Sequence, residues 1–269
     1  MTTATANVSP VNRATLAPSL ANHPIVSRQQ WIAERKKLQA REKELTRLGD
    51  QVARERRALP WARMEKDYLF DTPEGRRPLV DLFEGRHQLV VQHFMFGPGW
   101  EQGCKSCSFM ADHTDATLLH LAHRDTAFVA VSLAPLGEIE RFRQRMGWNF
   151  KWASAQDSDF NRDFAVSFPP ESRVDGEVYY NYRMTGFPQE EAPGISFFCK
   201  DDAGEVFHTY STFGRGVEAM MMTYDMLDMA PQGRGEDGDD YGMQWVRHHD
   251  RYEPAPVATA TSSCCAARA

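Results

Sequence analysis

Two cysteines three positions apart are the residues of this sequence best suited to chemistry. Cys104 and Cys107 lie between an apolar run and a predicted helix. At the start of a helix, this spacing can bring two sulfurs within disulfide-bonding range. The unpaired N–H groups of a helix N-terminus also favour a thiolate over a thiol. We therefore expect Cys104 to be a nucleophile and Cys107 to resolve the mixed disulfide that it forms.

Three neighbours of the pair are candidate supporting residues, namely Lys105, Trp100 and Glu101. Lys105 places a positive charge beside Cys104, which favours the thiolate. Glu101 could accept a proton from Cys107, although we interpret this loop carboxylate as exposed to solvent. The predicted reaction is thiol–disulfide exchange with a disulfide-containing protein or a small thiol. It needs an external electron donor but no organic cofactor or metal.

A pair of this spacing is also found in metal sites and in proteins where it has no chemistry. His93 and His113 could complete a set of two cysteines and two histidines. A helix that carries His113 would point away from the loop, so we interpret it as a capping or surface residue. The alternative function is a non-catalytic scaffold that binds a metal or a partner through Cys104 and Cys107.

Other reactive residues have simpler structural interpretations. Cys199 lies in an apolar run and is expected to be a small buried hydrophobe. The run His248-His249-Asp250 has no nucleophile near it in sequence, so we expect a terminal segment that docks through Trp245 and Tyr252. The pair Cys264-Cys265 is attributed to the biased composition of the tail. A set of methionines at helical spacing is expected to pack against the sheet, namely Met220, Met221, Met222, Met226 and Met229.

The order of apolar runs predicts the elements that position the cysteines. The run from His87 to Phe96 indicates a central strand covered on both faces, and Gly97-Pro98-Gly99 ends it. Strands and helices then alternate, which predicts parallel strands joined by right-handed crossovers. The later predicted elements are helices at 107–123, 135–146 and 217–229, and strands at 126–133, 194–200 and 205–212, the last two forming a hairpin.

The chain divides by composition into five segments. We expect a disordered tail (1–24), a basic helical arm (25–66), a central α/β domain (67–215), a C-terminal helical extension (216–253) and a disordered tail (254–269). In the arm, Ser27 is a candidate N-cap, and Trp31, Leu38, Leu45 and Val52 recur every seven residues, with an interruption expected at Gly49-Asp50. We expect this apolar stripe to pack on the chain's own domain, and pairing of two arms in a homodimer is the alternative.

Composition limits the function classes. The net charge is 31 − 37 = −6, which argues against general nucleic-acid binding, although residues 28–66 carry 12 − 6 = +6. The longest apolar runs are far shorter than the ~20 residues of a membrane span, and the first residues contain no secretory signal. Five cysteines are too few for a disulfide scaffold. We therefore expect a cytoplasmic protein that binds neither membranes nor nucleic acids.

Several segments resemble known families. The strand at Tyr68-Leu69-Phe70, the cysteine loop and the hairpin around Asp202-Ala203-Gly204 resemble the peroxiredoxin or redoxin type of the thioredoxin-like superfamily. More specifically, the blocks GCKSCSFMADH, SLAPLGEIERFRQRMGW, SDFNRDFAVSF and YDMLDMAPQGRGE resemble the bacterial DUF899 family, thioredoxin-like proteins predicted to be dithiol–disulfide oxidoreductases. The resemblance covers Ile25 to Tyr252. It implies an α/β fold with a central mixed sheet flanked by helices.

The sequence departs from the superfamily at three positions around the cysteines. Thioredoxins carry a tryptophan directly before the first cysteine, whereas here Gly103 takes that place and Trp100 lies further upstream. The proline that precedes the facing strand comes early, as Pro193, so Ile195 is expected at the position facing the site. A peroxiredoxin needs a Thr-x-x-Cys loop, which this chain lacks, so peroxidase activity is the lesser alternative.

Overall fold

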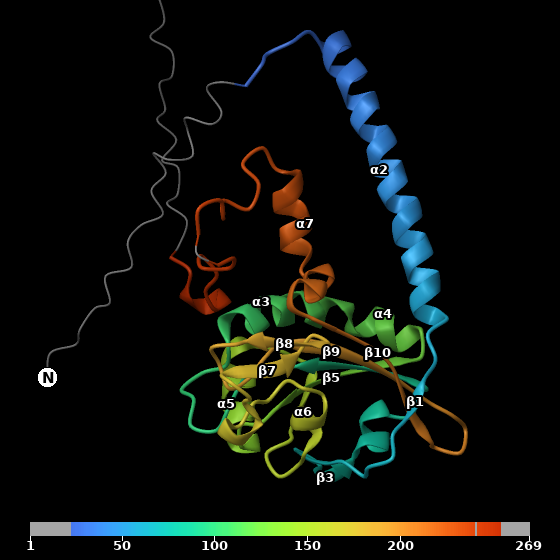
Figure 1. Cartoon of the computed structure of the whole chain (residues 1–269), viewed down its shortest axis with the longest axis vertical. Coiled ribbons are helices and arrows are strands. Elements are labelled where there is room, and N and C mark those ends of the chain that lie inside the picture. The colour runs from blue at the N-terminus through green and yellow to red at the C-terminus, as the bar shows by residue number, and fades with distance from the viewer. Residues whose placement is uncertain (1–22, 240, 254–269) are drawn as a thin grey trace, which may run out of the picture.

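The computed structural model describes residues 23–239 and 241–253, and its centre is one large mixed sheet (Figure 1). Eight strands lie in the order β1-β10-β9-β4-β5-β6-β2-β3. Their bounds are Ala62–Arg63 (β1), Leu69–Thr72 (β2), Gly75–Pro78 (β3), Gln88–His93 (β4), Thr126–Ser132 (β5), Lys151–Ser154 (β6), Gly194–Lys200 (β9) and Val206–Phe213 (β10).

Five strands in the middle of the sheet form the unit that carries the cysteines. β4 and β5 run parallel, and helices α3 (Lys105–Thr114) and α4 (Leu118–His123) connect them. β5 and β6 are also parallel and are joined through α5 (Leu136–Met146). β9 pairs antiparallel with β4, and β10 with β9, so the predicted hairpin is confirmed. The predicted parallel strands joined by helices are confirmed as well.

The central strand β4 is covered on both faces, as its apolar sequence predicts. Val90 packs in the cluster that contains the inner faces of α3 and α5. Leu89 and Val91 pack in the opposite cluster, with the 3-10 turn η2 (Leu79–Phe83) and the short helix α6 (Phe160–Asp163). Because successive side chains of a strand point to opposite faces, this one strand contributes to two cores.

A separate two-stranded sheet of β7 (Glu177–Tyr180) and β8 (Arg183–Gly186) is absent from the elements that the sequence predicts. Its turn residues Asn181 and Tyr182 have φ values of 51° and 64°, as a type I′ hairpin requires. Tyrosine is an uncommon residue in this conformation, so the sequence lacks the usual Asn-Gly signal. The hairpin packs near the start of β9, where the Tyr180 hydroxyl donates to the Pro193 carbonyl (2.7 Å).

The two edge strands of the large sheet are short and basic. β1 has two residues and includes Arg63, whose guanidinium pairs with Glu205 of the β9–β10 loop. β3 has four residues, includes Arg76 and Arg77, and ends at Pro78. β1 covers only Phe207 and His208 of β10, so both outermost strands are short and carry arginines.

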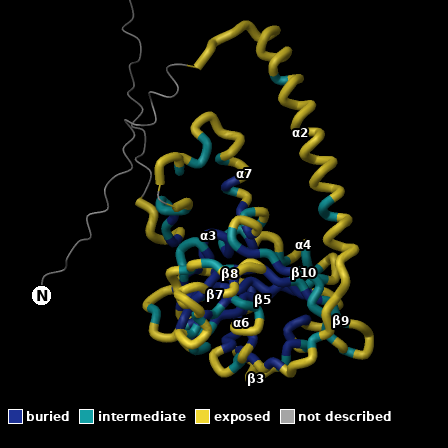
Figure 2. Tube along the Cα trace, in the orientation of Figure 1, coloured by how far each residue is buried: buried dark blue, intermediate teal, exposed yellow. Residues whose placement is uncertain are grey.

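The N-terminal arm is one continuous helix, α2 (Arg28–Arg57), that stands clear of the sheet (Figures 1 and 2). Ser27 is its N-cap, as predicted, and Gln30 completes a capping box. Two expectations about the arm are wrong. Gly49-Asp50 does not interrupt the helix, because one glycine costs a helix only ~1 kcal/mol. None of the helix residues is buried, so the arm does not pack along its own domain.

The methionine-rich region forms two short helices instead of the single one predicted. The 3-10 helix η5 (Gly214–Met220) is followed by α7 (Met222–Met229). Met221 lies between them with a non-helical φ of −116° and ψ of 72°, which separates the two helices. Met221 is buried in the core and Met220 packs against it, as expected. Met222, Met226 and Met229 are exposed, so the expectation of packing is wrong for these three.

The C-terminal part of the described chain returns to α3. Residues 243–253 include the turn η6 (His249–Arg251), and Val246 is buried in the same cluster as α3. The predicted tails, which include Cys264-Cys265, fall almost entirely outside the described residues. Among the described helices, none is both long and apolar enough to cross a membrane.

Candidate functional site

The two cysteines lie at the N-terminus of α3, directly after the loop that follows β4. Cys104 is the N-cap residue of the helix, and its backbone N–H donates to the Met95 carbonyl (2.9 Å). Its carbonyl accepts the Ser108 N–H and the Ser108 hydroxyl, both at 2.9 Å. Both cysteines are free thiols. These backbone bonds fix Cys104 at the helix start, where the sequence places it.

The Cys104 sulfur accepts several hydrogen bonds that stabilise its thiolate. The Cys107 thiol donates to it, and the backbone N–H groups of Cys107 and Ser106 add further bonds. Together these outweigh the effect of burial and lower the pKa of Cys104 to about 6. Cys104 remains partly exposed. Its surroundings therefore favour the thiolate over the thiol, and part of its side chain faces solvent.

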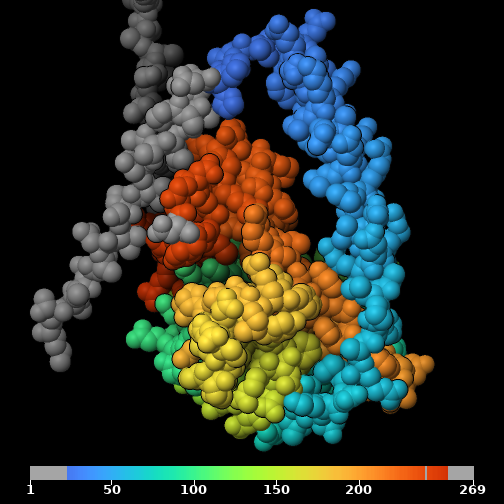
Figure 3. Space-filling view, in the orientation of Figure 1, coloured from blue at the N-terminus to red at the C-terminus, as the bar shows by residue number. Residues whose placement is uncertain are grey.

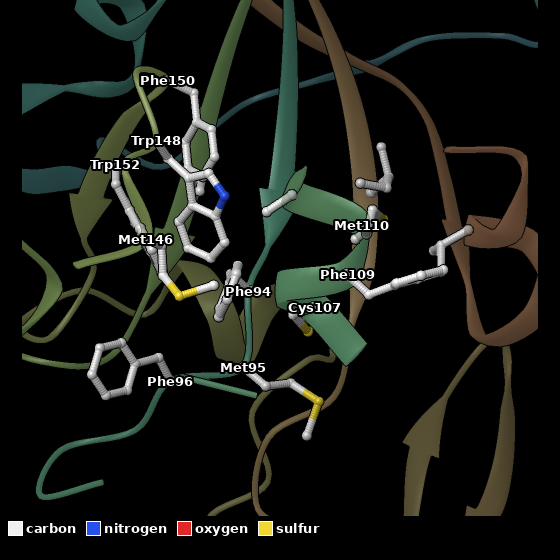
Figure 4. Packing of buried hydrophobic residues seen from close by; sticks show 14 of the residues in the cluster. Phe94, Met95, Phe96, Cys107, Phe109, Met110, Met146, Trp148, Phe150 and Trp152 are labelled. Carbon is white, nitrogen blue, oxygen red and sulfur yellow. The ribbon is translucent and has the colours of Figure 1, made fainter. Parts of the chain in front are cut away.

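Cys107 has the opposite character. Its side chain is 1% exposed and lies among Phe94, Met95, Phe109 and Met110 (Figure 4). The bond that it donates to Cys104, burial and the negative charge of Cys104 raise the pKa of Cys107 well above its ordinary value. The two cysteine side chains therefore differ in character. Cys104 is an acidic, partly exposed thiol, and Cys107 is a buried thiol that keeps its proton.

The loop before Cys104 explains why glycine replaces the tryptophan of thioredoxins. A Cβ atom at Gly103 would lie 2.6 Å from the Phe94 ring and 2.8 Å from the Phe142 ring, so no larger residue fits. The indole of Trp100 instead folds over Gly97, where a Cβ would come within 2.9 Å of its Nε1. Trp100 is half-buried and packs against the cluster that contains Cys107. The loop thus supplies its aromatic side chain from a different position.

The C-terminal segment holds this loop in place. His248 is buried, and its Nε2 donates to the Gly103 carbonyl at 2.8 Å. Burial of this imidazole lowers its pKa. The Lys105 ammonium donates to the Gln244 carbonyl at 2.9 Å. Lys105 therefore binds this segment and also lies near Cys104. Burial lowers the pKa of Lys105 more than the charge of Cys104 raises it.

A second set of contacts ties the same segment to α5 and α3. The Arg145 guanidinium forms two hydrogen bonds with Asp250 and a third with the Gln102 side chain. His249 Nδ1 lies 2.7 Å from a carboxylate oxygen of Asp112. Sequence analysis treats His248-His249-Asp250 as remote from any nucleophile. The structure corrects this, because the fold brings His248 to the residue directly before Cys104.

A buried carboxylate near Cys107 is a residue that sequence analysis missed. Glu191 is 4% exposed, and burial raises its pKa to about 7. Its charge in turn raises the pKa of Cys107. Glu101, the carboxylate considered from the sequence, is exposed in the loop. Glu191 is distant from the cysteines in sequence and directly follows another glutamate, so no local pattern distinguishes it.

The other candidate residues are engaged elsewhere. His93 is buried, and its Nε2 lies 2.7 Å from the Ser196 hydroxyl. His113 contacts the Phe109 carbonyl and the Thr223 hydroxyl, which holds it beside α7. Cys199 is half-buried on β9. Among the described residues, no three His, Cys, Asp or Glu side chains form a group suited to a metal.

The facing strand places Ile195 in the site. Ile195 is buried in the same cluster as Cys107, and Cys104 packs against this cluster. The preceding residue, Gly194, allows the Phe213 ring to approach, since a Cβ there would lie 2.7 Å away. The departure expected at Pro193 is thus accompanied by an apolar side chain in the hydrophobic cluster that contains Cys107.

Two pockets lie away from the sulfurs. One of about 290 Å³, between the loop and α5, is lined by residues that include Trp100, Glu101 and Arg145. A larger one of about 710 Å³ is lined by residues that include Lys151 at the start of β6 and the β2–β3 turn. Neither cysteine lines either pocket. Both pockets are therefore separate from the dithiol.

The fold and the pair together define a class of protein. A mixed sheet with the order β10-β9-β4-β5 and a C-x-x-C pair at the start of the helix that follows β4 is characteristic of thioredoxin-like proteins. Within this class, the chain belongs to DUF899, a family described as bacterial protein of unknown function, whose model matches residues 20–252. The resemblance stated from the sequence is thereby confirmed.

Comparison with solved structures finds similar folds at low identity. Peroxiredoxin Q from Xanthomonas campestris is 13% identical, with a TM-score of 0.41 over 61% of this chain and 90% of that chain. Peroxidoxin BcpB from Mycobacterium tuberculosis is 14% identical, with a TM-score of 0.42 over 61% of this chain and 93% of that chain. No curated protein sequence matches this chain.

Proposed function

We propose that this protein is a thiol–disulfide oxidoreductase in which Cys104 is the nucleophile and Cys107 the resolving thiol. The observation that carries the proposal is the position of the pair at the start of α3, with Cys104 as the partly exposed N-cap residue and Cys107 buried beside it, an environment that lowers the pKa of Cys104 to about 6. The substrate is a disulfide-containing protein or a small disulfide compound. An external dithiol returns the protein to its reduced form.

The reaction consists of two exchange steps. The Cys104 thiolate attacks one sulfur of the substrate disulfide, a mixed disulfide forms, and the other half of the substrate leaves as a thiolate. Cys107 then loses its proton and attacks the Cys104 sulfur, which forms the Cys104–Cys107 disulfide and releases the second half. The substrate gains two electrons, and the external dithiol later restores them to the protein.

The second step needs a base because the pKa of Cys107 is raised. We assign this role to Glu191, which is buried and has a pKa of about 7. About half of such carboxylates are ionised at neutral pH. We propose that Glu191, whose charge already acts on Cys107, takes the Cys107 proton when the mixed disulfide forms.

Alkylation of the reduced protein tests the first step. The rate at which iodoacetamide modifies Cys104 should rise with pH to a plateau, with a midpoint near 6. A free cysteine has its midpoint at about 8.5. Cys199, whose pKa burial raises, is the internal control, and peptide mass spectrometry separates the two sites. A Cys104 midpoint at or above the free-cysteine value would contradict the proposal.

A trapping variant tests the second step. Cys107→Ser should leave substrates attached to Cys104 as stable mixed disulfides that a reductant releases, while Cys104→Ser should retain none. Metal analysis before and after thiol blocking tests the alternative of a scaffold. Stoichiometric metal that blocking releases, together with no trapped substrate, would favour a metal-binding protein.

A further inference from the structure

The helix α2 carries an exposed apolar stripe. Four side chains along it are about half or more exposed: Trp31 (47%), Leu38 (56%), Leu45 (70%) and Leu48 (55%). Helices in proteins owe most of their stability to the packing of such a face, and none of the α2 residues is buried. The first three residues recur every seven positions, which is the spacing of a seam between helices. The stripe is therefore suited to contact with another protein surface.

A second exposed apolar face lies on α7. Met222, Met226 and Met229 have the i, i+4, i+7 spacing of one helix face and are 58%, 57% and 80% exposed. Methionine side chains are flexible and adapt to the surface that they contact. Figure 3 shows open space between α2 and the C-terminal region that contains α7. Within the part of the chain that the structure describes, neither apolar face is covered.

The charges of the two regions are opposite. Residues 28–57 contain ten Lys/Arg and five Asp/Glu, a balance of 10 − 5 = +5. Residues 222–239 contain one Arg and five Asp/Glu, a balance of 1 − 5 = −4. Two α2 helices would repel each other, whereas α2 and the acidic region attract. The charge pattern therefore favours contact of α2 with the acidic region over direct pairing of two arms.

We propose that α2 docks on the acidic, methionine-rich face (residues 222–239) of a second copy of this chain. The two copies exchange their arms around a two-fold axis, so the contact occurs twice and the buried area doubles. The chain's own face is excluded because α2 is continuous to Arg57 and stands across open space from α7 (Figure 3). The proposal does not depend on the chemistry of the cysteines.

A membrane surface fits α2 less well than a protein partner. Helices that lie on membranes present a broad apolar face. The stripe of α2 is narrow, and ion pairs such as Arg35–Glu42 and Arg41–Glu44 share the helix with it. This spacing suits contact with one helix rather than insertion into lipid.

Sedimentation of the full chain in reductant tests the dimer. The wild type should sediment as a dimer, and Leu38→Glu/Leu45→Glu should weaken its association about 100-fold or more, because each leucine loses roughly 1.5–3 kcal/mol of burial. Ala33→Glu/Ala40→Glu is the matched control, since it adds the same charge to exposed positions on the opposite side of α2. This control should associate with nearly wild-type affinity.

Charge reversal identifies the surface that α2 contacts. Asp225→Lys/Asp237→Lys should weaken the dimer, and adding Lys37→Glu/Arg41→Glu, at positions that flank the leucine stripe, should restore it. A wild type that is monomeric at all concentrations tested would overturn the proposal, as would binding of that monomer to anionic lipid vesicles through α2. A dimer that is sensitive to the leucine changes but not to the aspartate changes would also overturn it, because the arms would then pair with each other.

Discussion

Cys104 and Cys107 are the same amino acid, yet their pKa values are displaced in opposite directions. The helix start and the C-x-x-C spacing predict an acidic Cys104. The sequence cannot reveal that the largest contribution to this acidity is the hydrogen bond from Cys107. Nor does it reveal Glu191, because burial of one carboxylate depends on segments that meet only in the folded chain.

Glu191→Gln should raise stability and slow resolution. Burial raises the carboxyl pKa from 4.5 to about 7, so the stability cost of ionisation is absent below pH 4.5, grows up to pH 7 and is constant above it. The variant should gain on the order of 3 kcal/mol over the wild type above pH 7 and little below pH 4.5. Urea unfolding across pH measures this gain.

The kinetic part of this prediction has its own measurement. In the glutamine variant, the attack of Cys104 on a disulfide should keep its rate, while release of the product should slow at neutral pH. Stopped-flow measurement of both steps with a chromogenic disulfide separates them. A variant with wild-type product release at every pH would remove Glu191 from the mechanism and leave the dithiol assignment intact.

Among the elements, those with strong apolar runs were predicted and those without were not. β4, β5, α5 and the β9–β10 hairpin follow from sequence because their patterns are local. β1 is two residues long and exists only through its pairing with β10, so it carries no local signal. The loop around Gly103 is an intermediate case: its position was predicted, while its packing against two aromatic rings was not.

Gly103→Ala should destabilise the protein by about 1–3 kcal/mol, because the added methyl group overlaps the Phe94 and Phe142 rings. Gly137→Ala in α5 is the control. Its Cβ would have no neighbour closer than 3.8 Å, and alanine favours a helix, so a gain of about 0.5–1 kcal/mol is expected. Denaturant unfolding of the two variants measures both changes. Equal stabilities would contradict the packing described at Gly103.

At the scale of the whole molecule, the site depends on the C-terminal segment (243–253) packing against α3. No local sequence pattern predicts this packing. His248 reaches Gly103 only because the segment after α7 folds back over α3. Family resemblance and topology predict the sheet and the pair, but they do not predict this contact. The arm shows the converse, since its helix was predicted from sequence and its lack of packing was not.

The thiolate should also make the stability of the reduced protein depend on pH. The pKa of Cys104 falls on folding from about 9 to about 6, so its contribution is fully present above pH 9 and lost as the pH falls to 6. The difference in unfolding free energy between wild type and Cys104→Ser should therefore increase by a few kcal/mol from pH 6 to pH 9. A difference independent of pH would argue against a stabilised thiolate.

The short, arginine-bearing edges of the sheet have a consequence for how this molecule can fail. Fibrils grow when a long, flat border of a sheet recruits an identical strand from another molecule. The outermost strand at one border has two residues and covers part of β10, and the outermost strand at the other ends at Pro78 next to two like charges. Addition of a strand from another copy is therefore disfavoured at both outermost strands. Self-association through helices does not carry this risk of fibril growth.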